Sequence, residues 1–281
     1  MRAITLLTVL AVSGCSSILG IEGGNELIVD AGLDAPILPD APVVVREIFV
    51  APNGSDGNNG SAGAPLRSLT AAVTAPTPGM AKIIRVAPGT YDAANGEIFP
   101  LSLAPGIEIF GPGATLAGAV TGPLVVLGGG SVEELTINNT VGDGVQMTGG
   151  GALRFCSVSV AEVGLIISSP GATVFANTFV DGNAGVAISA PVAEFEFNTI
   201  FANEVGIELL VGVAITTQND VSCNVQADVR ASGGQASALD SFAWDHVPPE
   251  QGNLGGGIDI TTSGGSTVTA NNPGLVGAPC P

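Results

Sequence analysis

The chain has 281 residues, of which 46% are hydrophobic and 4% aromatic, and it contains 41 glycines and 19 prolines. This composition is typical of one large domain built from many short strands and turns, and it excludes a wholly disordered chain. Only 7 basic residues stand against 25 acidic ones, a net charge of −18, which argues against nucleic acid and anionic lipid as partners and disfavours an acidic polysaccharide unless a divalent cation bridges the two.

Residues 1–15 have the features of an export signal. Arg2 precedes a short apolar run, which is too short to span a membrane as a helix of the mature protein. The run ends in Val12-Ser13-Gly14-Cys15, which resembles the bacterial lipoprotein box, where small residues precede an invariant cysteine. The resemblance implies that Cys15 becomes the first mature residue and carries acyl chains, and that the protein is sorted to the outer membrane, because Ser16 and not Asp follows. An ordinary signal peptide with a chance cysteine is the alternative.

Residues 16–45 show no period of 2 or 3.6 and contain three prolines, a Gly-Gly pair and scattered acids. Proline and like charges keep such a segment extended, so we expect a tether that holds the folded domain away from the membrane. The folded domain is then expected over 46–281.

The domain begins with a strand–helix–strand unit. Apolar strands are expected over 47–51 and 82–87. Between them, Leu66, Leu69 and Val73 lie at helical spacing after Pro65 and predict a short amphipathic helix over 65–73.

Four sequence blocks in this region occur in a fixed order: Phe49-Val-Ala-Pro-Asn-Gly-Ser-Asp56, Ala64-Pro-Leu-Arg-Ser-Leu-Thr70, Ile84-Arg-Val-Ala-Pro-Gly-Thr-Tyr91 and Gly96-Glu-Ile-Phe-Pro-Leu101. Together they resemble the amino-terminal region of a family of exported bacterial β-helix proteins of unknown function, related in fold to the pectin lyases. The resemblance covers about residues 47–116. It implies a right-handed parallel β-helix whose first coil is capped by the short helix, and it implies no activity.

A repeat of 21 residues follows, seen in the spacing of Asn177, Asn198 and Asn219 and of Gly164, Gly185 and Gly206. Alternate apolar residues recur between these positions and predict an inward face that stacks alike in every coil, with coils about 4.8 Å apart. We therefore expect an all-β fold, a single right-handed parallel β-helix or solenoid, with its most regular coils over 131–231. After Asn219 the register slips: Ile207 is expected opposite Val229, since Asp228 there would be buried. Residues 233–281 depart from the repeat and predict an irregular cap.

The asparagine column is expected to hold the coils together, because an inward Asn at a bend can donate and accept hydrogen bonds one coil away. Cys156 falls in the same column, and we expect a buried thiol in place of an asparagine. If Cys15 is acylated, Cys223 and Cys280 are able to pair in an oxidising compartment, which would contribute about 4 kcal/mol in the chain-entropy model. Whether they pair stays open.

Glu162, Asn183 and Glu204 form another column at 21-residue spacing. Two coils separate the two acids by about 9.6 Å, near the upper limit for an inverting glycosidase pair, whereas an exposed turn column is the alternative. A lyase of this fold is expected to combine calcium-binding acids with a basic residue, yet Arg154 and Arg230 are the only basic residues beyond residue 85 and lie in different coils. The motifs of the related polygalacturonases are absent. The single His246 cannot form a structural zinc site, so no metal or cofactor is expected, and calcium has no support.

The sequence therefore predicts a non-catalytic cell-envelope lipoprotein whose β-helix is a structural or binding module. Its expected partners are the membrane, through the lipid anchor, and a carbohydrate or another envelope protein. A polysaccharide lyase or glycoside hydrolase of the pectin-lyase-like fold, with Glu162 and Glu204 as its carboxylates, is the alternative.

Overall fold

The computed structural model describes residues 44–271 and 275–276, with gaps at 216–217, 234–235, 241, 245–250 and 253–257. The expected signal peptide with Cys15, and nearly all of the expected tether, lie outside these residues, as do His246 and Cys280. The chain divides into residues 1–42 and 43–281, and only the second part is described below. Within the described residues, no helix is long and apolar enough to cross a membrane.

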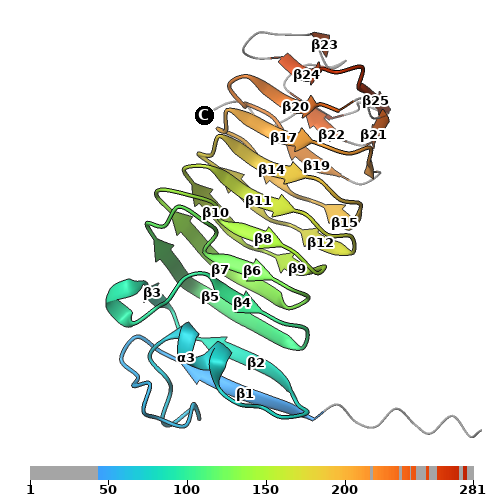
Figure 1. Cartoon of the computed structure of the whole chain (residues 1–281). Coiled ribbons are helices and arrows are strands. Elements are labelled where there is room, and N and C mark those ends of the chain that lie inside the picture. The colour runs from blue at the N-terminus through green and yellow to red at the C-terminus, as the bar shows by residue number, and fades with distance from the viewer. Residues whose placement is uncertain are drawn as a thin grey trace, which may run out of the picture. The chain divides into compact units, whose positions relative to one another are not determined.

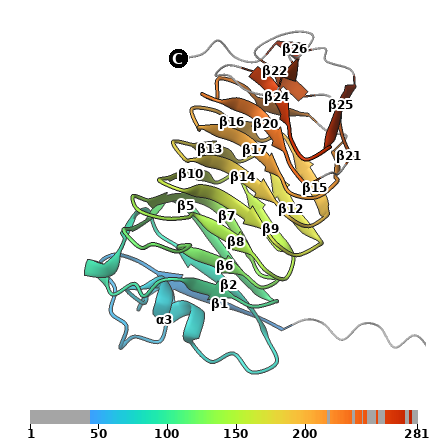
Figure 2. The same ribbon diagram turned by 45° about the horizontal axis from the view of Figure 1, so that its top comes forward.

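Neighbouring strands pair in parallel and wind into stacked coils, so the parallel β-helix predicted from the repeat is confirmed (Figures 1 and 2). The longest sheet follows the path β1 (Val45–Val50), β2 (Ala81–Val86), β5 (Ile107–Gly118), β7 (Ser131–Asn139), β10 (Ser157–Val160), β13 (Thr178–Val180), β16 (Thr199–Ile200), β19 (Asn219–Val221), β22 (Phe242–Trp244) and β26 (Leu275–Val276). Off this path it also includes β3 (Gly89–Tyr91), β9 (Gly151–Arg154), β12 (Ala172–Phe175) and β15 (Val192–Glu196).

The second sheet stacks β4 (Leu101–Leu103), β6 (Val125–Leu127), β8 (Val145–Met147), β11 (Val163–Ile167), β14 (Ala184–Ile188), β17 (Val205–Leu209), β20 (Ala227–Ala231), β24 (Ile258–Thr262) and β23 (Gln251–Gly252). A small third sheet contains β18 (Ala214–Ile215), β21 (Ala236–Asp240) and β25 (Thr267–Asn271). Because β24 and β25 pair in parallel with β20 and β21, they form a further coil, so the predicted irregular cap is partly regular.

The long strand β7 passes through a corner at Glu134, and the later coils divide at the same corner. Thus β9 precedes it and β10 follows it, and the pairs β12/β13 and β15/β16 repeat the arrangement. The corner residues all have left-handed backbones: Glu134, Phe155, Ala176 and Phe197, with φ between 53° and 58°. This corner column lies beside the asparagine column, which begins one residue later.

The core is filled by the alternate apolar residues that the repeat predicts. Val145, Leu165, Val186 and Ile207 are directly opposite one another in successive strands, and all are fully buried. The expected slip is also confirmed, since Ile207 pairs with Val229. The reason given for it was wrong, because Asp228 is only 2% exposed. Its Oδ1 accepts hydrogen bonds from the backbone N–H (3.3 Å) and side-chain amide (2.8 Å) of Asn224.

The 21-residue glycine column is explained by close approach between coils. A Cβ atom added at Gly164 would lie 2.5 Å from the carbonyl oxygen of Gly185, and one added at Gly206 would lie 2.5 Å from that of Asp228. At Gly185 the added atom would lie 2.5 Å from a methyl group of Ile200. Any side chain here would therefore push neighbouring coils apart.

The capping helix α3 spans Leu69–Thr74 and is shorter than predicted, because Ser68 is its N-cap and accepts a hydrogen bond from Ala71 N (3.1 Å). The buried Glu97 accepts hydrogen bonds from the backbone N–H groups of Leu69 (2.6 Å) and Thr70 (2.9 Å), beside a single 3-10 turn over Ala93–Asn95. At the other end, the Lys82 ammonium group donates to three carbonyl oxygens between residues 72 and 75. These two charges satisfy both helix ends, so the sequence blocks of this region build a cap.

Candidate binding surface

The asparagine column is buried and continuous. The side-chain amide of Asn177 donates to Asn198 Oδ1 (3.1 Å), and that of Asn198 donates to Asn219 Oδ1 (3.0 Å). The backbone N–H of Cys156 donates to Asn177 Oδ1 (2.9 Å), so Cys156 occupies the first place of the column, as predicted. Cys156 is a buried free thiol, and burial raises its pKa to about 12. These residues hold coils together and are closed to any ligand.

A second buried ladder of asparagines was not predicted from the sequence. Asn203 Oδ1 accepts from the Gly182 backbone N–H (3.0 Å), and the Asn203 amide donates to Asn224 Oδ1 (3.1 Å). The Asn224 amide in turn donates to Asp228 Oδ1 (2.8 Å). The 21-residue spacing of Asn203 and Asn224 was a visible signal, but glycine and aspartate at its ends concealed the ladder.

Glu162 and Glu204 lie exposed in the turns before β11 and β17, and each accepts a hydrogen bond from an amide one coil further on. The donors are Asn183 (2.8 Å to Glu162 Oε2) and Gln226 (3.0 Å to Glu204 Oε2). Glu162 also acts on the nearby carboxyl of Asp143. Burial raises the pKa of the Asp143 carboxyl, and the negative charge of Glu162 raises it further. The role of Glu162 and Glu204 as a catalytic pair stays a prediction.

Cys223 is disulfide-bonded, and its partner lies outside the described residues, so pairing with Cys280 stays a prediction. No cluster of three or more His, Cys, Asp or Glu side chains that could hold a metal ion occurs in the part of the chain that the structure describes.

The outward side of the longest sheet presents a straight row of side chains, which we call the outer row. One residue comes from each of seven successive strands, and their pairing places them side by side: Phe49, Arg85, Phe110, Glu133, Arg154, Phe175 and Glu196. Each is partly exposed, whereas the residue before it in its strand, Ile48 in β1 and its equivalents in the other strands, is buried and belongs to the inward face. The row therefore runs along the axis of coil stacking, and at about 4.8 Å per strand it is about 29 Å long.

Near the end of this row, Phe175 packs against two corner residues, Phe155 and Phe197, and we call these three residues the phenylalanine ladder. The ring centroids of Phe155 and Phe175 are 5.5 Å apart with the planes at 77°, and those of Phe175 and Phe197 are 5.4 Å apart at 72°. Phe155 is 49% exposed and Phe197 is 51% exposed. These edge-to-face contacts are favourable, but the two outer rings remain half in water.

The backbone at the two outer rings is strained. Phe155 has φ of 53° and Phe197 has φ of 56°, a left-handed conformation that costs about 1–2 kcal/mol for a residue with a Cβ. Bulky residues are rare there, and strain of this kind gathers at functional sites. Glu134 and Ala176 share this conformation, so it belongs to the corner of each coil; Phe155 and Phe197 differ from them in carrying a large, half-exposed ring at a position that favours glycine or asparagine.

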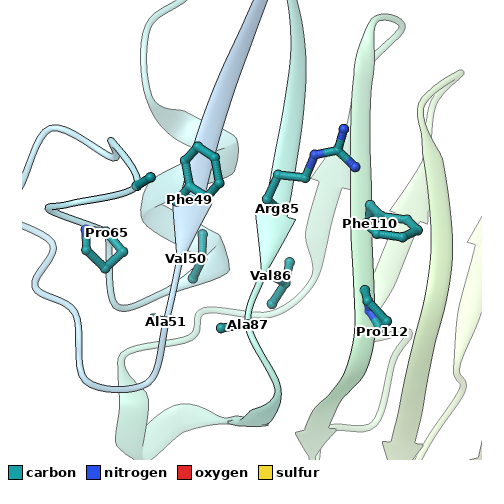
Figure 3. A pocket seen from close by; sticks show the side chains of 10 residues that line it. Phe49, Val50, Ala51, Pro65, Arg85, Val86, Ala87, Phe110 and Pro112 are labelled. Atoms are coloured by element: carbon teal, nitrogen blue, oxygen red, sulfur yellow. The ribbon is translucent and has the colours of Figure 1, made fainter.

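At the other end of the outer row lies a shallow pocket of about 290 Å³ (Figure 3). The side chain of Arg85 extends from β2 toward Phe110 on β5, with Phe49 on β1 at its other side. The Arg85 guanidinium carbon is 5.2 Å from the centroid of the Phe110 ring, and its Nη2 is 3.1 Å from Glu47 Oε1. Here a cation is held by an aromatic face and a carboxylate together.

The surroundings of the outer row are acidic. A second outward row lies two residues earlier in each strand and contributes Glu47, Glu108 and Glu194. Glu133, Glu196 and the corner residue Glu134 bring the number of carboxylates on this face to six. Only two guanidinium groups lie among them, those of Arg85 and Arg154. This face is therefore negatively charged, like the chain as a whole, and it also carries exposed aromatic rings.

The 21-residue repeat does not reveal this surface. The ladder residues are 20 and 22 residues apart, not 21, because Phe155 and Phe197 occupy the corner while Phe175 ends a strand. The periodic signal therefore falls on the buried column beside the ladder.

Comparison with known proteins gives a partial match. A family model described as "Protein of unknown function (DUF1565)" matches residues 52–132, which confirms the resemblance seen in the four sequence blocks. Among solved structures, the crystal structure of pectate lyase Pel9A is similar with 15% sequence identity and a TM-score of 0.48, over 85% of this chain and 83% of that chain. No curated protein matches the chain.

Proposed function

We propose that the domain is a non-catalytic binding module of the cell envelope, which holds an extended ligand along the outer row. The observation behind this proposal is the phenylalanine ladder, whose outer rings are half exposed on strained backbone. A rigid stack of coils keeps such side chains at fixed spacing and reduces the entropy lost on binding. An exposed apolar cluster on a regular solenoid is therefore best explained as a contact surface.

The test is a binding screen of the purified domain against immobilised polysaccharides and peptides, beside the variant Phe155→Ala/Phe197→Ala. Alanine is compatible with this corner, because Ala176 already occupies it in the coil between. A ligand that the native domain retains and the variant releases would support the proposal. Retention that does not depend on the two rings would contradict it.

The envelope location rests on Cys15, and we propose that its acylation anchors the domain in the outer membrane. Two or more acyl chains anchor a soluble domain stably, since each buried CH₂ contributes about 0.8 kcal/mol. Radiolabelled palmitate should be incorporated by the native chain and lost in Cys15→Ala. Equal labelling of both proteins would contradict lipid anchoring through Cys15.

A polysaccharide lyase or glycoside hydrolase is the second candidate function, and one observation favours it. Asp143 is half-buried with a raised pKa beside Glu162, and two carboxylates whose environments differ in this way suit an acid–base pair. A panel of plant, algal and bacterial polysaccharides would decide. Product release abolished by Asp143→Asn or Glu162→Gln would establish catalysis and overturn the non-catalytic proposal, as would the same loss in Glu204→Gln.

A further inference from the structure

We infer that the ligand of the outer row is a cationic polypeptide segment, rich in arginine and extended along the coil axis; this rests on the proposed binding function. The segment would place its guanidinium groups on the rings of the phenylalanine ladder and beside the carboxylates of β15.

The protein itself shows the contact at one end of the outer row. Arg85 lies over the ring of Phe110 and is ion-paired with Glu47 from the neighbouring strand. A guanidinium group is planar and weakly hydrated, so it can lie on an aromatic ring and still bond a carboxylate at its edge. Ring, cation and acid thus form one unit on this surface.

At the other end, the described residues show no cation over a ring of the ladder and no basic side chain paired with the acids of β15. Glu194 and Glu196 extend from β15, and Glu196 is directly opposite Phe175. Among the described residues, neither acid has an ion pair with a basic side chain, since the ion pair of Glu47 and Arg85 is the one found there. Arg154, on β9, is directly opposite Phe175, and no basic residue follows it in the sequence until Arg230. A partner's cations would complete the unit.

The ring geometry and the charge discriminate among ligand classes. A sugar stacks on a flat aromatic face, but neighbouring rings of the ladder stand at 77° and 72° to one another and make no continuous flat platform. An acidic polysaccharide or nucleic acid would be repelled by six carboxylates against two guanidinium groups. Long cationic side chains fit between tilted rings and gain from both the ring faces and the acids.

The length of the row sets the size of the segment. About 29 Å of surface accommodates about nine residues of extended polypeptide at roughly 3.3 Å each. Single exposed cation–π contacts and ion pairs are weak, so the affinity would come from several contacts made at once on a rigid surface.

The experiment is calorimetric titration of the domain with a capped nine-residue oligo-arginine peptide at physiological ionic strength, with a neutral glucan as the second probe. Phe155→Ala/Phe197→Ala is expected to weaken peptide binding about tenfold, and Glu194→Gln/Glu196→Gln to weaken it by a similar factor. The matched control is Asp181→Asn/Glu208→Gln, which removes the same charge outside the outer row and should leave the affinity within about twofold. Phe155→Gly/Phe197→Gly provides a second ring deletion that suits the left-handed corner.

The outcomes separate the two proposals. Equal weakening by both charge-removing variants, with no effect of the rings, would show diffuse attraction of a polycation to an acidic protein and would overturn the inference. Ring-dependent binding of the glucan without ring-dependent binding of the peptide would also overturn it, yet leave the binding function standing. Binding of neither probe to the native domain would overturn the inference. The proposed binding function would then be decided by the screen against immobilised polysaccharides and peptides.

Discussion

Replacement of Asn198 by alanine tests whether the buried asparagine column holds the coils together. The side chain takes part in four buried hydrogen bonds: its Oδ1 accepts from the backbone N–H (3.0 Å) and amide (3.1 Å) of Asn177, and its amide donates to Val174 O (3.0 Å) and Asn219 Oδ1 (3.0 Å). At a net contribution of about 1 kcal/mol each, Asn198→Ala should lower the free energy of unfolding by about 4 kcal/mol. Water cannot easily replace the lost partners, because the site is buried.

The assay is equilibrium unfolding in urea, monitored by circular dichroism, with the native m-value checked in each variant. The control is Asn183→Ala, which changes the same residue type in a column of the same period but in an exposed turn. Asn183 makes one side-chain hydrogen bond, to Glu162, and its loss should cost below about 0.5 kcal/mol. A loss under about 1 kcal/mol in Asn198→Ala, or equal losses in both variants, would refute the reasoning.

Three further predictions follow from buried and strained side chains. Tyr91, the single tyrosine, has its pKa raised to about 12, first by burial and then by the charge of Glu97, so absorbance at 295 nm should show no ionisation near pH 10; stability from the neutral phenol is complete below pH 10 and is lost as pH rises toward 12. Phe197→Gly should change the free energy of unfolding by less than about 1 kcal/mol in urea unfolding, because relief of backbone strain offsets the lost ring contact, whereas Phe179→Ala in the core should cost about 3–5 kcal/mol. The Cys156 thiol, buried and with its pKa raised to about 12, should resist iodoacetamide at pH 8 in the native protein and react fully in denaturant, as read by mass spectrometry of its peptide.

The repeat predicts the coil architecture well because each coil must bury the same face. Leu165 and its equivalents occupy positions that only apolar residues fill, and Gly164 and its equivalents occupy positions where any Cβ would meet the next coil. These constraints recur at one fixed interval, so the sequence shows them as a repeat. The register shift that places Val229 opposite Ile207 was predicted correctly. The expectation that Asp228 avoids burial was wrong, because its carboxylate is buried and hydrogen-bonded to Asn224.

The candidate surface could not be predicted in the same way, because exposed positions are not under the constraint that creates the period. The ladder rings meet diagonally, from a corner to a strand end, and their intervals differ from the repeat by one residue in each direction. A phenylalanine at a left-handed corner also runs against local preference, so sequence reasoning expects glycine or asparagine there. The local preference for glycine or asparagine thus gives the wrong residue type at the positions where we propose a function.

The exposed ladder depends on the buried column beside it. The corner residue Phe197 is followed by Asn198, whose backbone N–H donates to Asn219 Oδ1 (3.1 Å), while the backbone N–H of Phe197 donates to the Gln218 carbonyl. These bonds over-determine the corner and hold the strained backbone in place. Asn198→Ala should therefore weaken oligo-arginine binding as well as stability, even under conditions where the protein is fully folded.

Asn203→Ala provides the comparison. Its side chain also makes four hydrogen bonds, to Gly182, Phe179, Phe201 and Asn224, but in the second ladder and away from the corner column. Both variants should lose similar stability, and only Asn198→Ala should lose affinity for the nine-residue peptide, by several-fold, when binding is measured at a temperature well below both unfolding transitions. Equal affinities in the two variants would mean that the rings keep their positions without the column, and the link between buried column and exposed ladder would fail.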